Sequence, residues 1–173
     1  MKIGPLPTEL DLRSLAVRGA QVEGIVAEES LPRLRQAGIE MAGPVAAAFS
    51  FERDESGRYI VVAAIQATVL MICQRCLGPI SLDLNARSNM ACVWDDQEAV
   101  ALPAGYEPLI VGQVANLREI AEEEILLAIP VSPLHAEDCG TSEQKAALES
   151  EPAAKKEVSD RDSPFAVLEK LKT

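Results

Sequence analysis

Residues 59–72, YIVVAAIQATVLMI, run directly into Cys73-Gln74-Arg75-Cys76 and then into residues 80–85, ISLDLN. The first run is rich in Ile, Val and Thr, and the second alternates apolar and polar side chains with period two, so both are typical of β-strands. Residues 45–52 also fit a strand. We therefore expect an antiparallel meander from Val45 to Trp94, in which residues 73–79 form a sharp connection.

The clearest helix is predicted over residues 116–129. The Asn116 side chain can accept a backbone N–H, and Glu119 three residues later completes a capping box. An apolar stripe at helical spacing follows, which indicates a helix with one buried face. The fold class is therefore predicted to be α+β, an antiparallel β meander with helices packed on it.

Two shorter helices are expected nearer the N terminus. Residues 8–16 form the first, with Thr8 as its cap. Residues 28–37 form the second, with Ser30 as its cap and Pro32 in the first turn.

Composition suggests three parts along the chain. Residues 1–139 hold the apolar segments and are predicted to form a single α+β domain. Residues 140–162 are rich in Ser, Glu, Lys, Ala and Pro, which predicts a flexible acidic linker. Residues 163–173 begin with Ser and Pro and restore an apolar pattern, which predicts a short C-terminal docking helix.

The charge balance limits the partners that the chain can bind directly. Of the 173 residues, 27 are acidic and 16 are basic, for a net charge of −11. Broad binding to a phosphate backbone needs a basic surface, so we expect a basic protein as the direct partner. No signal peptide and no apolar run of membrane-spanning length are visible, which predicts a cytoplasmic protein with no membrane partner, whose thiols are reduced or metal-bound.

Cys73 and Cys76 allow three interpretations. With His135, the only histidine, and Cys139, they supply four ligands suited to tetrahedral zinc. Alternatively, the pair is a thioredoxin-like redox site, although that chemistry needs a thiolate at a helix N terminus. In the third interpretation the two thiols pack as small apolar groups around a tight turn. The remaining cysteine, Cys92, is expected in the core of a strand.

No other catalytic signal stands out. No nucleophile is paired with a base at an informative spacing, and no phosphate-binding glycine motif is present. We therefore expect no catalytic activity. The acidic stretch with Glu119, Glu122 and Glu123 is either a solvated helix face or part of a partner-binding surface.

Three separated blocks resemble one bacterial family. They are CQRCLGPISLDL at residues 73–84, LREIAEEEILLAIPVSPLH at residues 117–135 with Cys139 nearby, and SPFAVLEKLK at residues 163–172. In this order they resemble the YceD family, named for large ribosomal RNA subunit accumulation. The stretch LPAGYEPLIV at residues 102–111 is also similar. The matching motif positions are Cys73, Arg75, Cys76, Leu77, Pro79, Glu123, Pro130, Pro133, His135, Cys139, Pro164 and Phe165.

The resemblance implies a ribosome biogenesis factor that supports the synthesis, processing or stability of 23S ribosomal RNA. Combined with the acidic charge, it suggests a non-catalytic adaptor for a basic ribosomal protein or assembly factor, with indirect contact to 23S RNA. Phe165 and Leu168 would be apolar anchors of such an adaptor. A zinc- or thiol-dependent enzyme using the Cys73/Cys76 pair is the alternative, and a local RNA contact through Arg75 and Arg87 is a further one.

Overall fold

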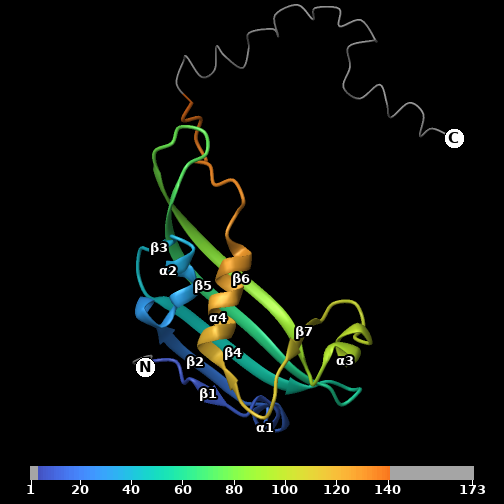
Figure 1. Cartoon of the computed structure of the whole chain (residues 1–173). Helices are drawn as coiled ribbons and strands as arrows, with labels where there is room; N and C mark the ends of the chain where they lie inside the picture. Colours follow the sequence, from blue (N-terminus) through green and yellow to red (C-terminus); the bar gives the residue numbers. More distant parts are fainter. Residues whose placement is uncertain (1–3, 141–173) are drawn as a thin grey trace, which may run out of the picture. The chain divides into compact units, whose positions relative to one another are not determined.

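A computed structural model describes residues 4–140 of the chain. The predicted C-terminal helix with Phe165 and Leu168, and the predicted linker beyond Gly140, lie outside the described residues. All named elements lie in one compact unit that ends at His135. In chain order they are β1 (Glu9–Leu10), α1 (Leu12–Val17), β2 (Gln21–Val26), a 3-10 turn (Glu28–Ser30), α2 (Pro32–Gln36), β3 (Glu40–Met41), β4 (Val45–Arg53), β5 (Tyr59–Ile72), β6 (Pro79–Val93), α3 (Asp96–Val100), β7 (Glu107–Ile110), β8 (Ala115–Asn116) and α4 (Leu117–Ala128) (Figure 1).

The main sheet has the strand order β2-β4-β5-β6-β7, with β3 pairing beside β5. Every pairing in it is antiparallel except that between β6 and β7, which is parallel. The predicted meander is confirmed, with two differences. Residues 79–93 form one continuous strand, because β6 stays paired with β5 from Pro79 to Ala91. The edge strand β2 had no strand pattern strong enough to be predicted.

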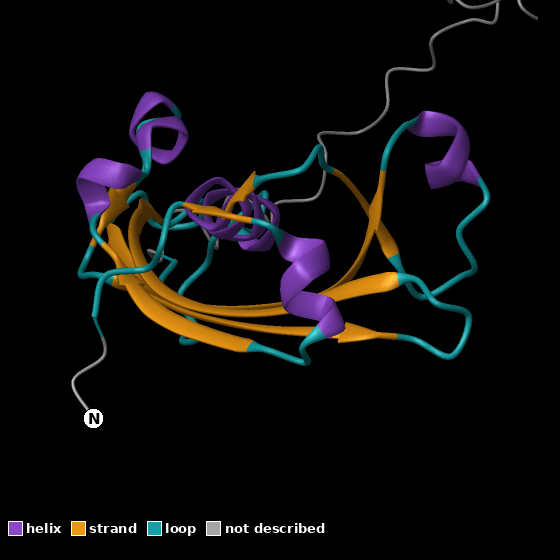
Figure 2. Cartoon of the chain, turned by 90° about the horizontal axis from the view of Figure 1, so that it is seen from below, coloured by secondary structure: helices purple, strands orange, loops and turns teal. Residues whose placement is uncertain are grey.

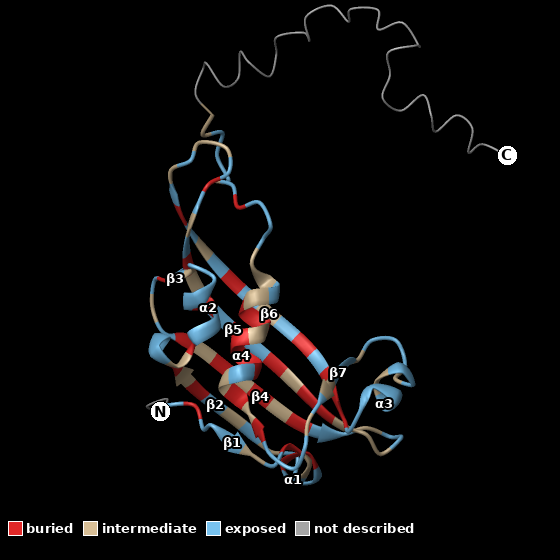
Figure 3. Ribbon diagram, in the orientation of Figure 1, coloured by how far each residue is buried: buried red, intermediate tan, exposed pale blue. Residues whose placement is uncertain are grey.

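One face of the curved sheet carries the helices, as the view from below shows (Figure 2). Burial alternates along the strands as this arrangement requires (Figure 3). In β5, Val61, Ala63 and Ile65 are buried while Ala64 and Gln66 are exposed. Aromatic residues make up only 3% of the chain, so Phe49 and Phe51 join a core that is otherwise largely aliphatic. Each large aliphatic side chain buried in this way contributes about 1.5–3 kcal/mol.

The helix α4 confirms the main helix prediction. Asn116 is its N-cap, and its side chain accepts a hydrogen bond from the Arg118 N–H at 3.0 Å. Glu119 reaches back to Asn116 as predicted. However, its carboxylate accepts a hydrogen bond from the Asn116 side-chain amide, at 2.9 Å, and not from the backbone N–H that a capping box uses.

The two shorter helices begin later than predicted. Asp11, rather than Thr8, caps α1, because residues 9–10 are extended and pair with β8. The predicted helix over residues 28–37 is divided into a 3-10 turn and α2, and Ser30 caps neither of them. The free N–H groups at the start of α2 are instead satisfied by the distant carboxylate of Glu122.

Candidate metal centre

The Cys73–Cys76 motif forms the turn of the β5–β6 hairpin. Cys73 N–H donates to the Gly78 carbonyl at 2.9 Å, and Leu77 N–H donates to the Cys73 carbonyl at 2.9 Å. Leu77 has a φ of 60°, a left-handed conformation that lets the chain reverse before Gly78 and Pro79 start the next strand. These bonds close the turn that contains both cysteines.

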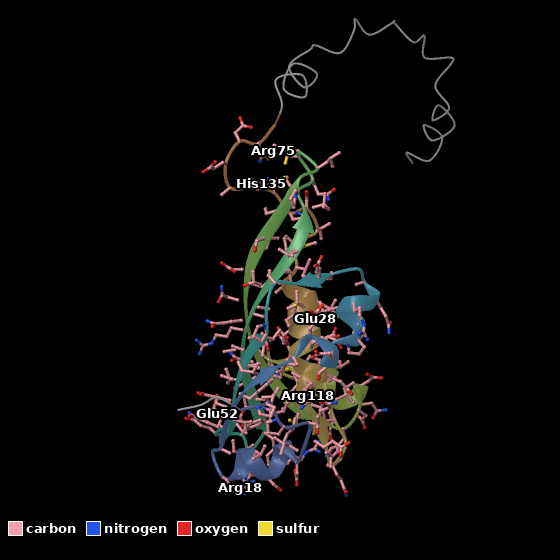
Figure 4. The ribbon with its side chains drawn as sticks, turned by 90° about the vertical axis from the view of Figure 1, so that its left-hand side faces the viewer. Arg18, Glu28, Glu52, Arg75, Arg118 and His135 are labelled. Atoms are coloured by element: carbon pink, nitrogen blue, oxygen red, sulfur yellow. The ribbon has the colours of Figure 1, made fainter. Side chains whose placement is uncertain are left out.

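A distant segment reaches the same turn. Pro130 follows the end of α4, and the chain then runs alongside the hairpin to His135 (Figure 1). The buried Pro133 accepts a hydrogen bond from the Gln74 N–H through its carbonyl at 2.8 Å. This bond holds the segment against the turn, and Figure 4 shows Arg75 and His135 together at this end of the hairpin with sulfur atoms beside them.

Four possible ligands converge here. One ligand atom from each of Cys73, Cys76, His135 and Cys139 lies within 4.8 Å of the other three. The Cys76 Sγ and His135 Nδ1 atoms are 3.5 Å apart. In a tetrahedral zinc site, sulfur and nitrogen ligands at about 2.3 Å and 2.0–2.1 Å from the ion are about 3.5 Å apart. The observed separation therefore already suits a shared ion.

The second nitrogen of His135 supports the same arrangement. His135 Nε2 lies 3.1 Å from the carbonyl oxygen of Pro79. A carbonyl only accepts hydrogen bonds, so Nε2 carries the proton, and a neutral ring then presents the lone pair of Nδ1 toward Cys76. Metal-binding histidines are commonly oriented by such a bond from the non-ligating nitrogen.

Cys73 is also held by a hydrogen bond that suits a metal ligand. Cys73 is fully buried, and its Sγ accepts a hydrogen bond from the Arg75 N–H at 3.4 Å. A backbone donor of this kind stabilises negative charge on sulfur. Three thiolates and one imidazole form a soft, closed donor set that suits structural zinc, and a fourth protein ligand leaves no open position for a substrate. The residues present therefore fit the ion.

The predicted acidic helix face of Glu119, Glu122 and Glu123 is wrong at one position. Glu122 is not an exposed residue: it is 1% exposed and accepts hydrogen bonds from the N–H groups of Arg33 and Leu34, at 2.6 and 3.1 Å. It points inward because its position on α4 faces the start of α2, whose unpaired N–H groups need an acceptor. Glu119 is exposed, and the half-buried Glu123 forms an ion pair with Arg33.

The two arginines considered for RNA contact do not form one surface. Arg75 lies in the hairpin turn, and Arg87 is an exposed residue of β6, eight positions beyond Pro79. At about 3.3 Å per residue this separates Arg87 from the turn by about 26 Å along the strand. Cys92 is buried in β6 as predicted, away from the four converging ligands.

Two backbone contributions to the site could not be predicted from the sequence. The Pro79 carbonyl orients His135, and the Pro133 carbonyl holds the second segment on the turn. Both prolines are motif positions of the resemblance, which was the one available signal, but a carbonyl contact is independent of the side chain and leaves no pattern of residue types.

The fold and the site define a small α+β protein with a three-cysteine, one-histidine cluster at the end of a β-hairpin. The profile of the family described as "Large ribosomal RNA subunit accumulation protein YceD" matches residues 61–172, which include this cluster and α4. The chain belongs to the YceD family. It is similar to the large ribosomal RNA subunit accumulation protein YceD of Haemophilus influenzae, with 29% identity over 170 residues and 96% of each chain covered.

No solved structure matches the chain significantly. Among the helices of residues 4–140, none combines the length and the apolar character needed to cross a membrane.

Proposed function

We propose that this protein supports the accumulation of 23S ribosomal RNA in the cytoplasm, as a non-catalytic binding protein. The observation that carries this proposal is the family match over residues 61–172, together with a similar protein of the same description that is covered almost end to end. The predicted role in ribosome biogenesis thus rests on the hairpin, the cysteine motif and the main helix together.

The surroundings of the cysteine pair favour binding over redox catalysis. Catalytic dithiols of the thioredoxin type have a thiol at a helix N terminus, where the helix dipole lowers its pKa. Here the pair occupies a turn between the antiparallel strands β5 and β6. Its neighbours are a histidine and a third cysteine, which together resemble a structural metal site more closely than a redox centre.

The acidic charge supports an adaptor that contacts protein rather than RNA. A net charge of −11 opposes a second polyanion and attracts basic proteins. A basic ribosomal protein or assembly factor is the proposed direct partner, with 23S RNA held through it.

Capture of the tagged full-length chain from cell extract, with and without nuclease, tests this role. We expect large-subunit RNA to exceed small-subunit RNA in the untreated sample, and a basic protein to remain bound after nuclease. Nuclease-protected RNA cross-linked to the chain itself would show direct RNA contact instead. Equal recovery of both RNAs at background level would contradict the adaptor.

We further propose that Cys73, Cys76, His135 and Cys139 bind one zinc ion that fixes the hairpin turn to the segment after α4. The 3.5 Å approach of Cys76 to His135 and the orientation of His135 by Pro79 support this proposal. The ion's role would be structural, as a cross-link between segments far apart in sequence. Elemental analysis of protein purified without chelator should find about one zinc per chain, and less than a tenth of an equivalent would reduce the cluster to turn packing.

A further inference from the structure

A groove of about 840 Å³ lies between α4 and the segment that contains β7 and β8. Its floor includes Met90 of β6, and the edge strand β7 forms one wall. The opposite wall is the face of α4 with Ile120, Glu123 and Leu127. All of these residues belong to the unit that ends at His135.

The charge lining the groove is strongly negative. Among residues 4–140, five glutamates line it, and Arg33 is the one basic residue that does. Arg33 is already paired with Glu123, one of the five. The groove therefore presents an excess of carboxylates to any molecule that enters it.

Glu124 lies in this groove as a buried carboxyl group. Its side chain is only 7% exposed, and within residues 4–140 no lysine, arginine or histidine forms an ion pair with it. Burial raises the pKa of Glu124, and the nearby carboxylates of Glu107 and Glu123 raise it further, while the hydroxyl of Ser88 lowers it. A buried carboxylate without a cation is costly, and a cationic group from outside would relieve that cost.

The groove also exposes apolar side chains at its margins. Leu127 is 68% exposed, Val114 is 52% exposed and Ile110 is 51% exposed. Apolar residues gathered around an acidic groove form a surface that can bind both hydrocarbon and positive charge.

We propose that this groove binds a basic segment of a partner protein, in which lysine or arginine side chains alternate with apolar ones. The cationic groups would reach Glu107, Glu123 and Glu124, and the apolar groups would cover Ile110 and Leu127. Charge favours this occupant over RNA or a second copy of the chain, because both of those are acidic. The inference rests on the proposed adaptor function and names the surface through which the adaptor acts.

Fluorescence anisotropy of the full-length chain with a labelled peptide of alternating lysine and leucine tests the groove. Replacing the two acidic positions together, Glu107→Gln with Glu124→Gln, should weaken binding about tenfold or more. Leu127→Ser should weaken it about threefold through lost apolar contact. Matched controls lie outside the groove on exposed positions: Glu40→Gln with Glu55→Gln for charge, and Val100→Ser for apolar area. Circular dichroism should show that all variants are folded.

The proposal requires the controls to bind as the natural chain does, and an oligolysine peptide without leucine to bind more weakly. Equal weakening by the control variants would show general charge attraction and would contradict binding of the peptide in the groove. Displacement of the peptide by an oligouridylate RNA would also contradict the proposal that the groove binds a basic protein segment. Because peptide binding is measured without ribosomes, failure of the groove proposal and failure of the ribosomal role are distinguishable. A normal RNA ratio in cells that lack the protein would contradict the ribosomal role and would leave peptide binding by the groove unaffected.

Discussion

His135 is the residue whose geometry says most about the cluster. One ring nitrogen meets the Pro79 carbonyl and the other faces Cys76, so the ring is fixed on both sides. Replacing it by alanine should remove one ligand and the link between the two segments.

We predict that His135→Ala and Cys76→Ser each reduce bound zinc from about one equivalent to a small fraction and lower the melting temperature, because metal binding and folding are coupled. Zinc is measured by elemental analysis and stability by thermal unfolding. Cys92→Ala is the matched control and should retain zinc. A His135→Ala protein with a full equivalent of zinc would exclude this histidine as a ligand.

The thiols should also differ in reactivity. Burial raises the pKa of Cys92 to about 11. At pH 7 only about one part in ten thousand of such a thiol is thiolate, the form that reacts. After chelation, iodoacetamide should therefore modify the partly exposed Cys76 long before Cys92, as peptide mass spectrometry can show. Faster modification of Cys92 would contradict its burial in β6.

Glu124 should make the stability of the folded protein depend on pH. Its pKa is raised in the folded protein, chiefly by burial, so the folded state binds this proton more tightly than the unfolded state. The associated stability is present below the ordinary carboxyl pKa and is lost as pH rises through the raised value. Glu124→Gln should therefore gain stability relative to the natural chain as pH rises from 4 to 7 in urea unfolding experiments. A difference between the two proteins that does not change with pH would contradict the raised pKa.

Among the elements, α4 and α2 are joined through Glu122. Its carboxylate takes the place of a helix cap for α2, supplied from 89 residues away. Glu122→Ala should lower the free energy of unfolding by about 1–3 kcal/mol, because the buried N–H of Leu34 and the partly buried N–H of Arg33 lose their acceptor. Glu119→Ala, on the exposed side of the same helix, should change it much less. Equal losses in urea unfolding would mean that the Glu122 contact is unimportant.

The predictability of each element follows from where its stabilising contacts lie. The strands β4, β5 and β6 and the helix α4 were predictable because their patterns are local: β-branched runs, period-two alternation and an N-cap. The start of α2 was not, because its acceptor comes from α4. Likewise, β1 pairs with β8 across more than a hundred residues, and this pairing displaced the helix predicted from Thr8.

The candidate site follows the same rule. The spacing of the cysteines and the single histidine allowed four candidate ligands to be predicted from the sequence, and these four residues converge. The burial of Glu122 and Glu124 was not predictable, because four nearby glutamates on a helix with one apolar stripe are typical of a solvated face. Only the packing of α2 and β6 against α4 shows which of these carboxylates point inward.

For the whole molecule, the hairpin cluster and the acidic groove share no residue and are separate features. Zinc would fix the end of the β5–β6 hairpin, while the groove beside α4 would hold a basic partner. Loss of the cluster should therefore reduce stability, and substitutions in the groove should reduce binding without unfolding the chain, since their effects arise from different contacts.

The proposed role in 23S ribosomal RNA accumulation can be measured in cells as the ratio of mature 23S to 16S RNA. We predict that deleting the gene lowers this ratio and that the full-length chain restores it. The Glu40→Gln, Glu55→Gln variant should restore the 23S to 16S ratio as well, and it serves as the control that a substituted chain is expressed. An unchanged ratio in the deletion strain would contradict the ribosomal role.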